Sequence, residues 1–176
     1  MVYIKHPGYN ADGFSTCHGL EDYNRIHELN FLALIRKLRL EKGRFLDIGC
    51  GNGIFLDDIQ GAFPDVSTIG VDFKEYESRV KDFRVGDARS IHVDSHSVDF
   101  VVSTCVSQWI RNRKDEIYRE IFRVLTPGGA AVVFPCNLED IPIGLEHDFK
   151  LRKLLKGPYH VPVNQLVVGI DEDLAF

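Results

Sequence analysis

Apolar residues recur along the chain in blocks that predict alternating helices and strands. Helical spacing over residues 20–40 predicts one helix, and Gly43 after it can act as a C-terminal cap. Further helices are expected over residues 53–62, 76–81 and 114–125. Strands are predicted at residues 44–48, 66–71, 83–85, 98–103 and 130–134, and the strand at 98–103 is nearly continuous in apolar residues. This alternation implies an α/β fold, a doubly wound and mostly parallel sheet with helices on both faces.

The pattern is weaker after Phe134. Residues 163–170 predict one more strand, and residues 147–155 are expected to form a helix. A further short strand could come from residues 141–145, so the sheet is expected to have six or seven strands and a shortened C-terminal end. We interpret residues 1–176 as one domain: an N-terminal lid loop and helix (1–40), a ligand-binding core (44–135) and a shortened cap with the last strand (136–176).

Composition narrows the functional class. Of the 176 residues, 44% are hydrophobic, and the net charge of −5 argues against a nucleic-acid-binding surface. The four cysteines contain no C-x-x-C pair, so neither a metal site nor a disulfide framework is predicted. The N-terminus has no signal-peptide pattern and no apolar run is long enough to span a membrane, so a cytoplasmic protein is expected.

Residues 45–53 read Phe-Leu-Asp-Ile-Gly-Cys-Gly-Asn-Gly and are the most informative segment. They predict a buried strand, a tight glycine turn and the start of a helix, a combination that suits a nucleotide or nucleoside. A dinucleotide-binding turn requires G-x-G-x-x-G, whereas the third glycine here comes one residue early, at Gly53. Asp47 would also repel a pyrophosphate, but it suits a ligand with a cationic amine.

Candidate ligand-binding residues stand at the ends of the next strands. The carboxylate of Asp72 can accept both hydrogen bonds of a ribose diol, and Phe73 can cover one face of a purine. Asp87 can accept from an exocyclic amine, while the N–H of Ala88 can donate to a ring nitrogen. Thr104 ends its strand close to the expected glycine loop. These residues could also have purely structural roles: Asp72 as a helix cap, Asp87 as a turn residue and Phe73 as part of the core.

Taken in order, these segments resemble the class I S-adenosylmethionine-dependent methyltransferases. Residues 45–53 resemble motif I, 71–72 motif II, 86–88 motif III and 98–103 motif IV, and 123–129 resemble the turn before strand 5. The resemblance implies a Rossmann-like sheet, S-adenosyl-L-methionine as cofactor and transfer of its methyl group. It implies that Gly49, Cys50 and Gly51 lie along the methionine moiety and that Asp47 lies near its amino group. It also implies that Asp72 binds the ribose and that the adenine is surrounded by Phe73, Asp87 and Ala88.

The acceptor is expected to be a small molecule or a protein side chain. Enzymes of this fold that methylate exocyclic amines of bases, or a protein glutamine, carry Asn/Asp-Pro-Pro-Tyr/Phe/Trp after strand 4, whereas this chain has Ser-Thr-Cys-Val at 103–106. The acceptor pocket is expected to be lined by residues from both ends of the chain: His6, Tyr9, His18, Tyr23, Cys136, Asn137 and His147. No catalytic base is identified, because a positioned acceptor need not require one.

Two alternatives stay open at the level of sequence. The shortened C-terminal part also fits a methyltransferase-like domain that binds cofactor or a partner without catalysis, or a homodimer in which a second copy completes the pocket. A nicotinamide-dependent oxidoreductase is disfavoured by Asp47 and by Ile54, which stands where the fingerprint wants glycine.

Overall fold

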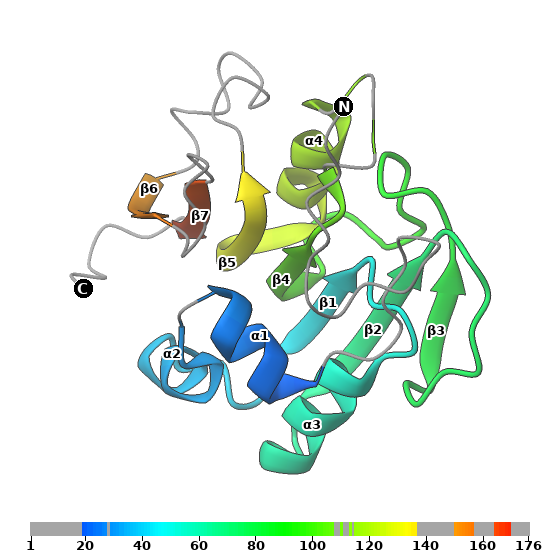
Figure 1. Cartoon of the computed structure of the whole chain (residues 1–176), viewed down its shortest axis with the longest axis horizontal. Coiled ribbons are helices and arrows are strands. Elements are labelled where there is room, and N and C mark those ends of the chain that lie inside the picture. The colour runs from blue at the N-terminus through cyan, green and yellow to red at the C-terminus, as the bar shows by residue number, and fades with distance from the viewer. Residues whose placement is uncertain are drawn as a thin grey trace.

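The computed structural model describes residues 19–27, 29–107, 110, 113, 115–136, 150–156 and 164–169. They form one seven-stranded sheet in the order β3-β2-β1-β4-β5-β7-β6 (Figure 1). The strands are β1 (Arg44–Ile48), β2 (Ser67–Asp72), β3 (Asp82–Val85), β4 (Val98–Thr104), β5 (Leu125–Cys136), β6 (Lys150–Lys156) and β7 (Asn164–Gly169). The helices are α1 (Leu20–His27), α2 (Phe31–Lys37), α3 (Ile54–Ala62) and α4 (Asp115–Val124).

Strands β1 to β5 are parallel, and β6 and β7 add an antiparallel end beside β5. The predicted doubly wound, mostly parallel sheet is therefore confirmed, with seven strands. Because β1 is the middle one of the five parallel strands, with β2 on one side and β4 on the other, the chain crosses over at β1. In open α/β sheets, ligands bind at the carboxyl ends of the strands beside such a switch point.

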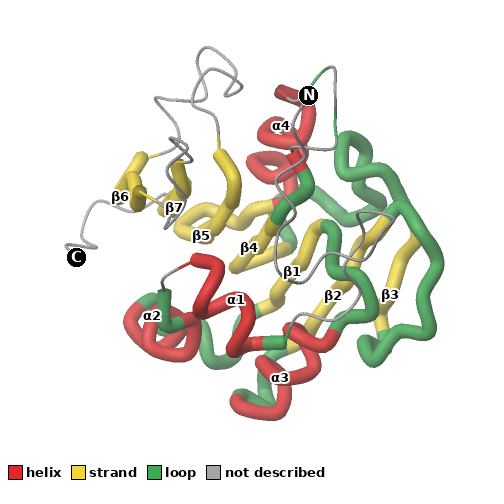
Figure 2. Tube along the Cα trace, in the orientation of Figure 1, coloured by secondary structure: helices red, strands yellow, loops and turns green. Residues whose placement is uncertain are grey.

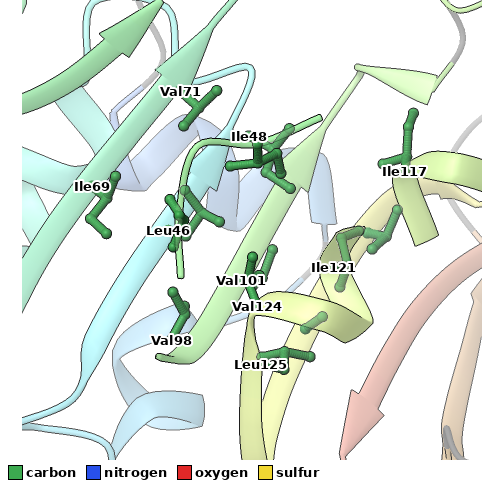
Figure 3. Close-up of a cluster of buried hydrophobic side chains, with 14 of the residues drawn as sticks. Leu46, Ile48, Ile69, Val71, Val98, Val101, Ile117, Ile121, Val124 and Leu125 are labelled. Carbon is green, nitrogen blue, oxygen red and sulfur yellow. The ribbon is translucent and has the colours of Figure 1, made fainter. Parts of the chain in front are cut away.

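Helices cover both faces of the sheet, as Figure 2 shows. On one face, α4 packs its buried side chains against alternate residues of β1, β2 and β4 (Figure 3). On the other face, α1, α2 and α3 pack against the intervening residues. The alternation is clear in β1, where Leu46 and Ile48 face α4 while Phe45 faces the other three helices.

The helix predicted over residues 20–40 is in fact two helices, α1 and α2. Asn30 ends the run in an extended conformation and caps α2, accepting from the N–H of Ala33 at 2.9 Å. Asn24 accepts from the N–H of Phe31, also at 2.9 Å. Asparagine side chains that capture backbone N–H groups compete with a continuous helix, which is why apolar spacing alone misses the break.

The helix predicted over residues 76–81 is absent, and the backbone there contacts the glycine turn instead. The N–H of Arg79 donates to the carbonyl of Asn52 at 2.9 Å, and the N–H of Val80 donates to the Ser78 hydroxyl at 3.1 Å. These bonds use N–H groups that a helix would need, so the tertiary contact overrides a short helical pattern.

Two further expectations near the C-terminus need correction. The strand expected at 130–134 begins earlier, at Leu125, and includes part of the turn expected at 123–129: Leu125 pairs with Val98, the next pair is Ala130 with Phe100, and Gly128 between them has φ +85°. The helix predicted over 147–155 is wrong, because Lys150–Lys156 forms β6 and pairs antiparallel with β7. The strand expected at 163–170 is confirmed as β7. The proposed strand at 141–145 lies outside the described residues.

Gly70 in the middle of β2 makes room for the glycine turn. A Cβ at this position would lie 2.7 Å from Sγ of Cys50 and 3.5 Å from its Cβ. Cys50 is buried in the turn that follows β1. The absence of a side chain on β2 therefore lets the turn lie directly against the sheet.

We predict that Gly70→Ala lowers the free energy of unfolding by about 1–3 kcal/mol, because the new methyl group overpacks the contact with Cys50. Urea unfolding measures the change. In the same variant, Cys50→Ala should recover most of the loss.

The matched control is Gly61→Ala in α3, where an added Cβ meets nothing within 4 Å. Alanine there should be neutral or stabilising by about 0.5–1 kcal/mol, because it favours the helix. Equal losses at the two glycines, or no recovery by Cys50→Ala, would contradict the proposed contact.

Candidate functional site

The turn between β1 and α3 needs glycine for its backbone conformation. Gly49, Gly51 and Gly53 have φ values of 79°, 54° and 79°. The turn is also crowded: a Cβ on Gly49 would lie 2.2 Å from Val106, and one on Gly53 would lie 2.4 Å from Val80. The G-x-G-x-G spacing thus places backbone, rather than side chains, at the carboxyl end of β1.

Backbone hydrogen bonds hold this turn against the end of β2. The N–H groups of Gly49 and Cys50 both donate to the carbonyl of Val71, at 2.7 and 3.2 Å, and the N–H of Gly51 donates to Oδ2 of Asp72 at 2.9 Å. These three N–H groups already have acceptors within the protein. A ligand can therefore approach the backbone of the turn closely, but it does not find these three N–H groups available as donors.

Asp72 joins three segments at the end of β2. Besides Gly51, its carboxylate accepts from the N–H of Lys74 through Oδ1 at 3.1 Å, and its carbonyl accepts from the N–H of Gly86 at 2.8 Å. Burial raises the pKa of Asp72, while hydrogen bonds from the N–H groups of Gly51, Lys74 and Phe73 lower it. The alternative of a helix cap does not apply, because no helix follows.

Asp47 is the most buried acid of the site, with an exposed fraction of 0%. Its Oδ2 accepts from the hydroxyl of Tyr23 at 2.9 Å, whereas its Oδ1 is buried and has no hydrogen-bond partner among the described residues. Burial raises the pKa of Asp47 to about 7; the hydrogen bond from Tyr23 lowers it, and the charge of Asp72 raises it further. A buried, unpartnered carboxylate oxygen favours a cationic donor.

The residues expected around a purine lie farther along the same edge of the sheet. Phe73 is 62% exposed, which leaves its ring accessible. The carboxylate of Asp87 forms an ion pair with Arg89 at 2.6 Å, which keeps the pKa of Asp87 low. Ala88 packs against the apolar cluster that faces α4. The hydrogen bond from the N–H of Gly86 to the carbonyl of Asp72 brings this segment to the end of β2. The side chain of Asp87, however, is engaged by Arg89.

Thr104 and Tyr23 complete the site at the ends of β4 and α1. Thr104 is buried and its side chain forms a hydrogen bond with Tyr23. Tyr23 was expected to line an acceptor pocket, and that expectation is wrong, because its side chain is 4% exposed and bonded to Asp47. Its place three residues after Leu20 on α1 signals burial, but its partner 24 residues later cannot be read from the pattern.

The other residues expected at the acceptor pocket cannot be placed. His6, Tyr9, His18, Asn137, His147 and the side chain of Cys136 lie outside the described residues. Within the described ranges, no group of three His, Cys, Asp or Glu side chains could hold a metal ion. In that same part of the chain, no helix combines the length and apolar character needed to cross a membrane.

Comparison with known proteins gives the family. Residues 46–133, half of the chain, match the family model described as the methyltransferase domain. The malonyl-[acyl-carrier protein] O-methyltransferase of Methylococcus capsulatus is 34% identical over 110 residues, which cover 57% of this chain and 40% of that protein. The biotin biosynthesis bifunctional protein BioHC of Cellvibrio japonicus is 33% identical over 101 residues, which cover 54% of this chain and 20% of that protein.

Among solved structures, a SAM-dependent methyltransferase from Aquifex aeolicus has a TM-score of 0.59 and covers 86% of this chain and 95% of its own, at 16% identity. That likeness shows the fold. The chain spans less than half the length of the two curated relatives above.

The chain belongs to the class I S-adenosylmethionine-dependent methyltransferase family, as the order of its motifs predicts. S-adenosyl-L-methionine is the cofactor of that family. The matched span includes every residue that the sequence nominates for binding it.

The environment of Asp47 predicts a pH-dependent stability. Its folded-state pKa of about 7 lies above the ordinary value of 3.8, so the neutral carboxyl favours the folded state. This contribution is fully present below about pH 4 and is lost as the pH rises to about 7, in total about 4 kcal/mol. Asp72, whose pKa is also raised, acts in the same direction.

We therefore expect Asp47→Asn to be more stable than the wild type at pH 8, and to lose less stability between pH 5 and pH 8. Urea unfolding at the two pH values measures both. The acids Asp82, Asp87 and Glu120 have lowered pKa values and titrate below this window. Parallel pH profiles of the two proteins would show that Asp47 is not the titrating group.

Proposed function

We propose that this chain binds S-adenosyl-L-methionine at the carboxyl ends of β1 and β2 and transfers its methyl group to a small molecule or a protein side chain. The observation that carries the proposal is the buried Oδ1 of Asp47, which has no hydrogen-bond partner among the described residues and lies next to a glycine turn that a ligand can approach closely. The ammonium group of the methionine moiety supplies the cationic donor that this oxygen lacks. A dinucleotide would instead bring a pyrophosphate, which the same carboxylate repels.

The ribose assignment of Asp72 is compatible with its internal hydrogen bonds. The carboxylate accepts from the N–H groups of Gly51, Lys74 and Phe73, and its two oxygens offer about four lone-pair sites, so one site remains for a ribose hydroxyl. One carboxylate can therefore hold the turn and still accept from a ribose diol. We propose that Asp72 does both.

For the adenine, we keep the predicted roles of Phe73, Asp87 and Ala88. The exposed ring of Phe73 supports stacking. Asp87 would share its carboxylate between Arg89 and the exocyclic amine, since a carboxylate accepts at several lone pairs. Thr104, at the end of β4 and bonded to Tyr23, would lie at the methionine end of the ligand.

When bound, the sulfonium supplies an activated methyl group: a bond forms from the acceptor to the methyl carbon, the carbon–sulfur bond breaks, and S-adenosylhomocysteine is released. The described residues contribute binding and orientation. Within those ranges no side chain is assigned as a general base.

The acceptor class rests on family relatives and on the sequence of β4. Two of these relatives are a malonyl-[acyl-carrier protein] O-methyltransferase and a bifunctional biotin-biosynthesis protein, which makes a carboxylate on a small or carrier-bound molecule the first acceptor to test. Residues 103–106 lack the pattern for methylating bases. The cytoplasmic location and the homodimer stay predictions.

Calorimetric titration with S-adenosylhomocysteine tests the cofactor, with NADH as the comparison ligand. We expect S-adenosylhomocysteine to bind and NADH not to bind; the reverse result would revive the oxidoreductase. Radiolabelled methyl transfer onto carboxylates, amines and protein acceptors then tests catalysis. Cofactor binding without turnover on any acceptor would favour the silent binding domain.

We predict that Asp72→Ala weakens S-adenosylhomocysteine binding by about 1.5–3 kcal/mol, the usual worth of hydrogen bonds to a charged group. Because the variant also frees the N–H groups of Gly51 and Lys74, it should lower the stability of the fold as well. Calorimetry and urea unfolding measure the two effects.

The matched control is Asp99→Ala. Asp99 lies near the amino end of β4 and accepts from the N–H of Arg44 at 2.8 Å and from the Thr126 hydroxyl at 3.0 Å. It should therefore cost stability without changing ligand affinity. Equal affinity losses in the two variants would contradict a direct role for Asp72.

A further inference from the structure

Tyr23 links α1 to the buried acid of the site. Its ring stacks on Phe55 of α3, with centroids 4.0 Å apart and planes 9° apart, and meets the edge of Phe31 in α2 at 6.1 Å. Its hydroxyl donates to Oδ2 of Asp47 and forms a second hydrogen bond with Thr104. One side chain therefore connects three helices on this face of the sheet to the ends of β1 and β4.

The hydrogen bond from Tyr23 determines which oxygen of Asp47 is available to a ligand. With Oδ2 engaged by Tyr23, Oδ1 is the oxygen left buried without a partner among the described residues. An unrestrained carboxylate could rotate about its terminal torsion, which is broad and roughly two-fold. The tyrosine hydroxyl restricts that rotation.

We propose that Tyr23 is a positioning residue, which orients the Asp47 carboxylate for the ammonium group of the cofactor and makes docking of α1 a condition for tight cofactor binding. The proposal rests on the proposed function. It assigns to α1, which precedes the glycine turn by more than twenty residues, a share in the cofactor site. Tyr23 does not itself touch the reacting atoms, so it is not a catalytic residue.

The surroundings of Asp47 explain why the hydroxyl matters. Among the described residues, Tyr23 from α1, Asp72 from β2 and Cys50 from the turn interact with Asp47. Thr104 from β4 forms its hydrogen bond with Tyr23. Of these, the Tyr23 hydrogen bond lowers the pKa of Asp47, whereas burial and the charge of Asp72 raise it. Removing the hydroxyl should therefore favour the neutral carboxyl, which attracts an ammonium group less.

The test is Tyr23→Phe, which removes the hydroxyl and keeps the ring between Phe55 and Phe31. Binding of S-adenosylhomocysteine is measured by calorimetry between about pH 6 and pH 8.5. We expect the affinity at pH 7 to fall about tenfold, because the Asp47 carboxyl is then less restricted in orientation and more often neutral. We also expect the pH midpoint of binding to move upward, so that the loss shrinks at higher pH.

The matched control is Tyr118→Phe, since Tyr118 is a buried tyrosine of α4 on the opposite face of the sheet. Its affinity and pH midpoint should equal those of the wild type. A loss of affinity in Tyr23→Phe that is the same at every pH would indicate a purely structural role and overturn the proposal. Unchanged affinity and an unchanged midpoint would overturn it as well.

A double-mutant cycle with Asp47→Asn isolates the coupling. In the Asp47→Asn background, Tyr23→Phe should cause little further loss, because the hydroxyl no longer orients a carboxylate. Additive losses would show that the two residues act independently. Failure of the wild type to bind S-adenosylhomocysteine would overturn the proposed function together with this inference, whereas wild-type binding with an unaffected Tyr23→Phe overturns this inference alone.

Discussion

The site depends on closure of the glycine turn against the end of β2. Two N–H groups of the turn share the carbonyl of Val71, and a third donates to Asp72. This arrangement requires Gly70, because a side chain on β2 would occupy the space of Cys50. Once the turn is closed, the backbone at the end of β1 and the carboxylate at the end of β2 belong to one rigid unit, on which a ligand can be positioned.

The closed turn also places two acids close to one another in a poorly hydrated environment. Burial raises the pKa of both Asp47 and Asp72, and the charge of Asp72 raises the pKa of Asp47 further. Asp47 also retains an oxygen with no partner among the described residues. Such an arrangement works against the stability of the folded protein near neutral pH. It is the environment in which a cationic ligand gains most, because its charge offsets both carboxylates in a low-dielectric surrounding. An unfavourable electrostatic environment of this kind is typical of functional sites rather than of ordinary cores.

Most of the fold could be predicted because its strands are buried on both faces. The short apolar segments at β1, β2 and β4, together with the strong amphipathic pattern of α4, indicate a buried sheet covered by helices. The errors fall where side-chain capture or long-range pairing overrides local pattern. Asn24 and Asn30 divide a helix, the backbone of Asn52 accepts from a segment that was expected to be helical, and β6 pairs with β7 although its own spacing fits a helix.

By itself, the sequence determined the family, the cofactor class and the order along the chain of the strands that carry the candidate binding residues. It could do so because the glycine turn and the strand-end acids are local patterns with a direct chemical meaning. Only the tertiary structure decided how these residues are used. The N–H groups of Gly49, Cys50 and Gly51 are engaged internally, and Tyr23 is a partner of Asp47 rather than part of an open pocket. The physical reason is that hydrogen bonds between residues far apart in sequence depend on how helices pack on the sheet, which no local pattern encodes.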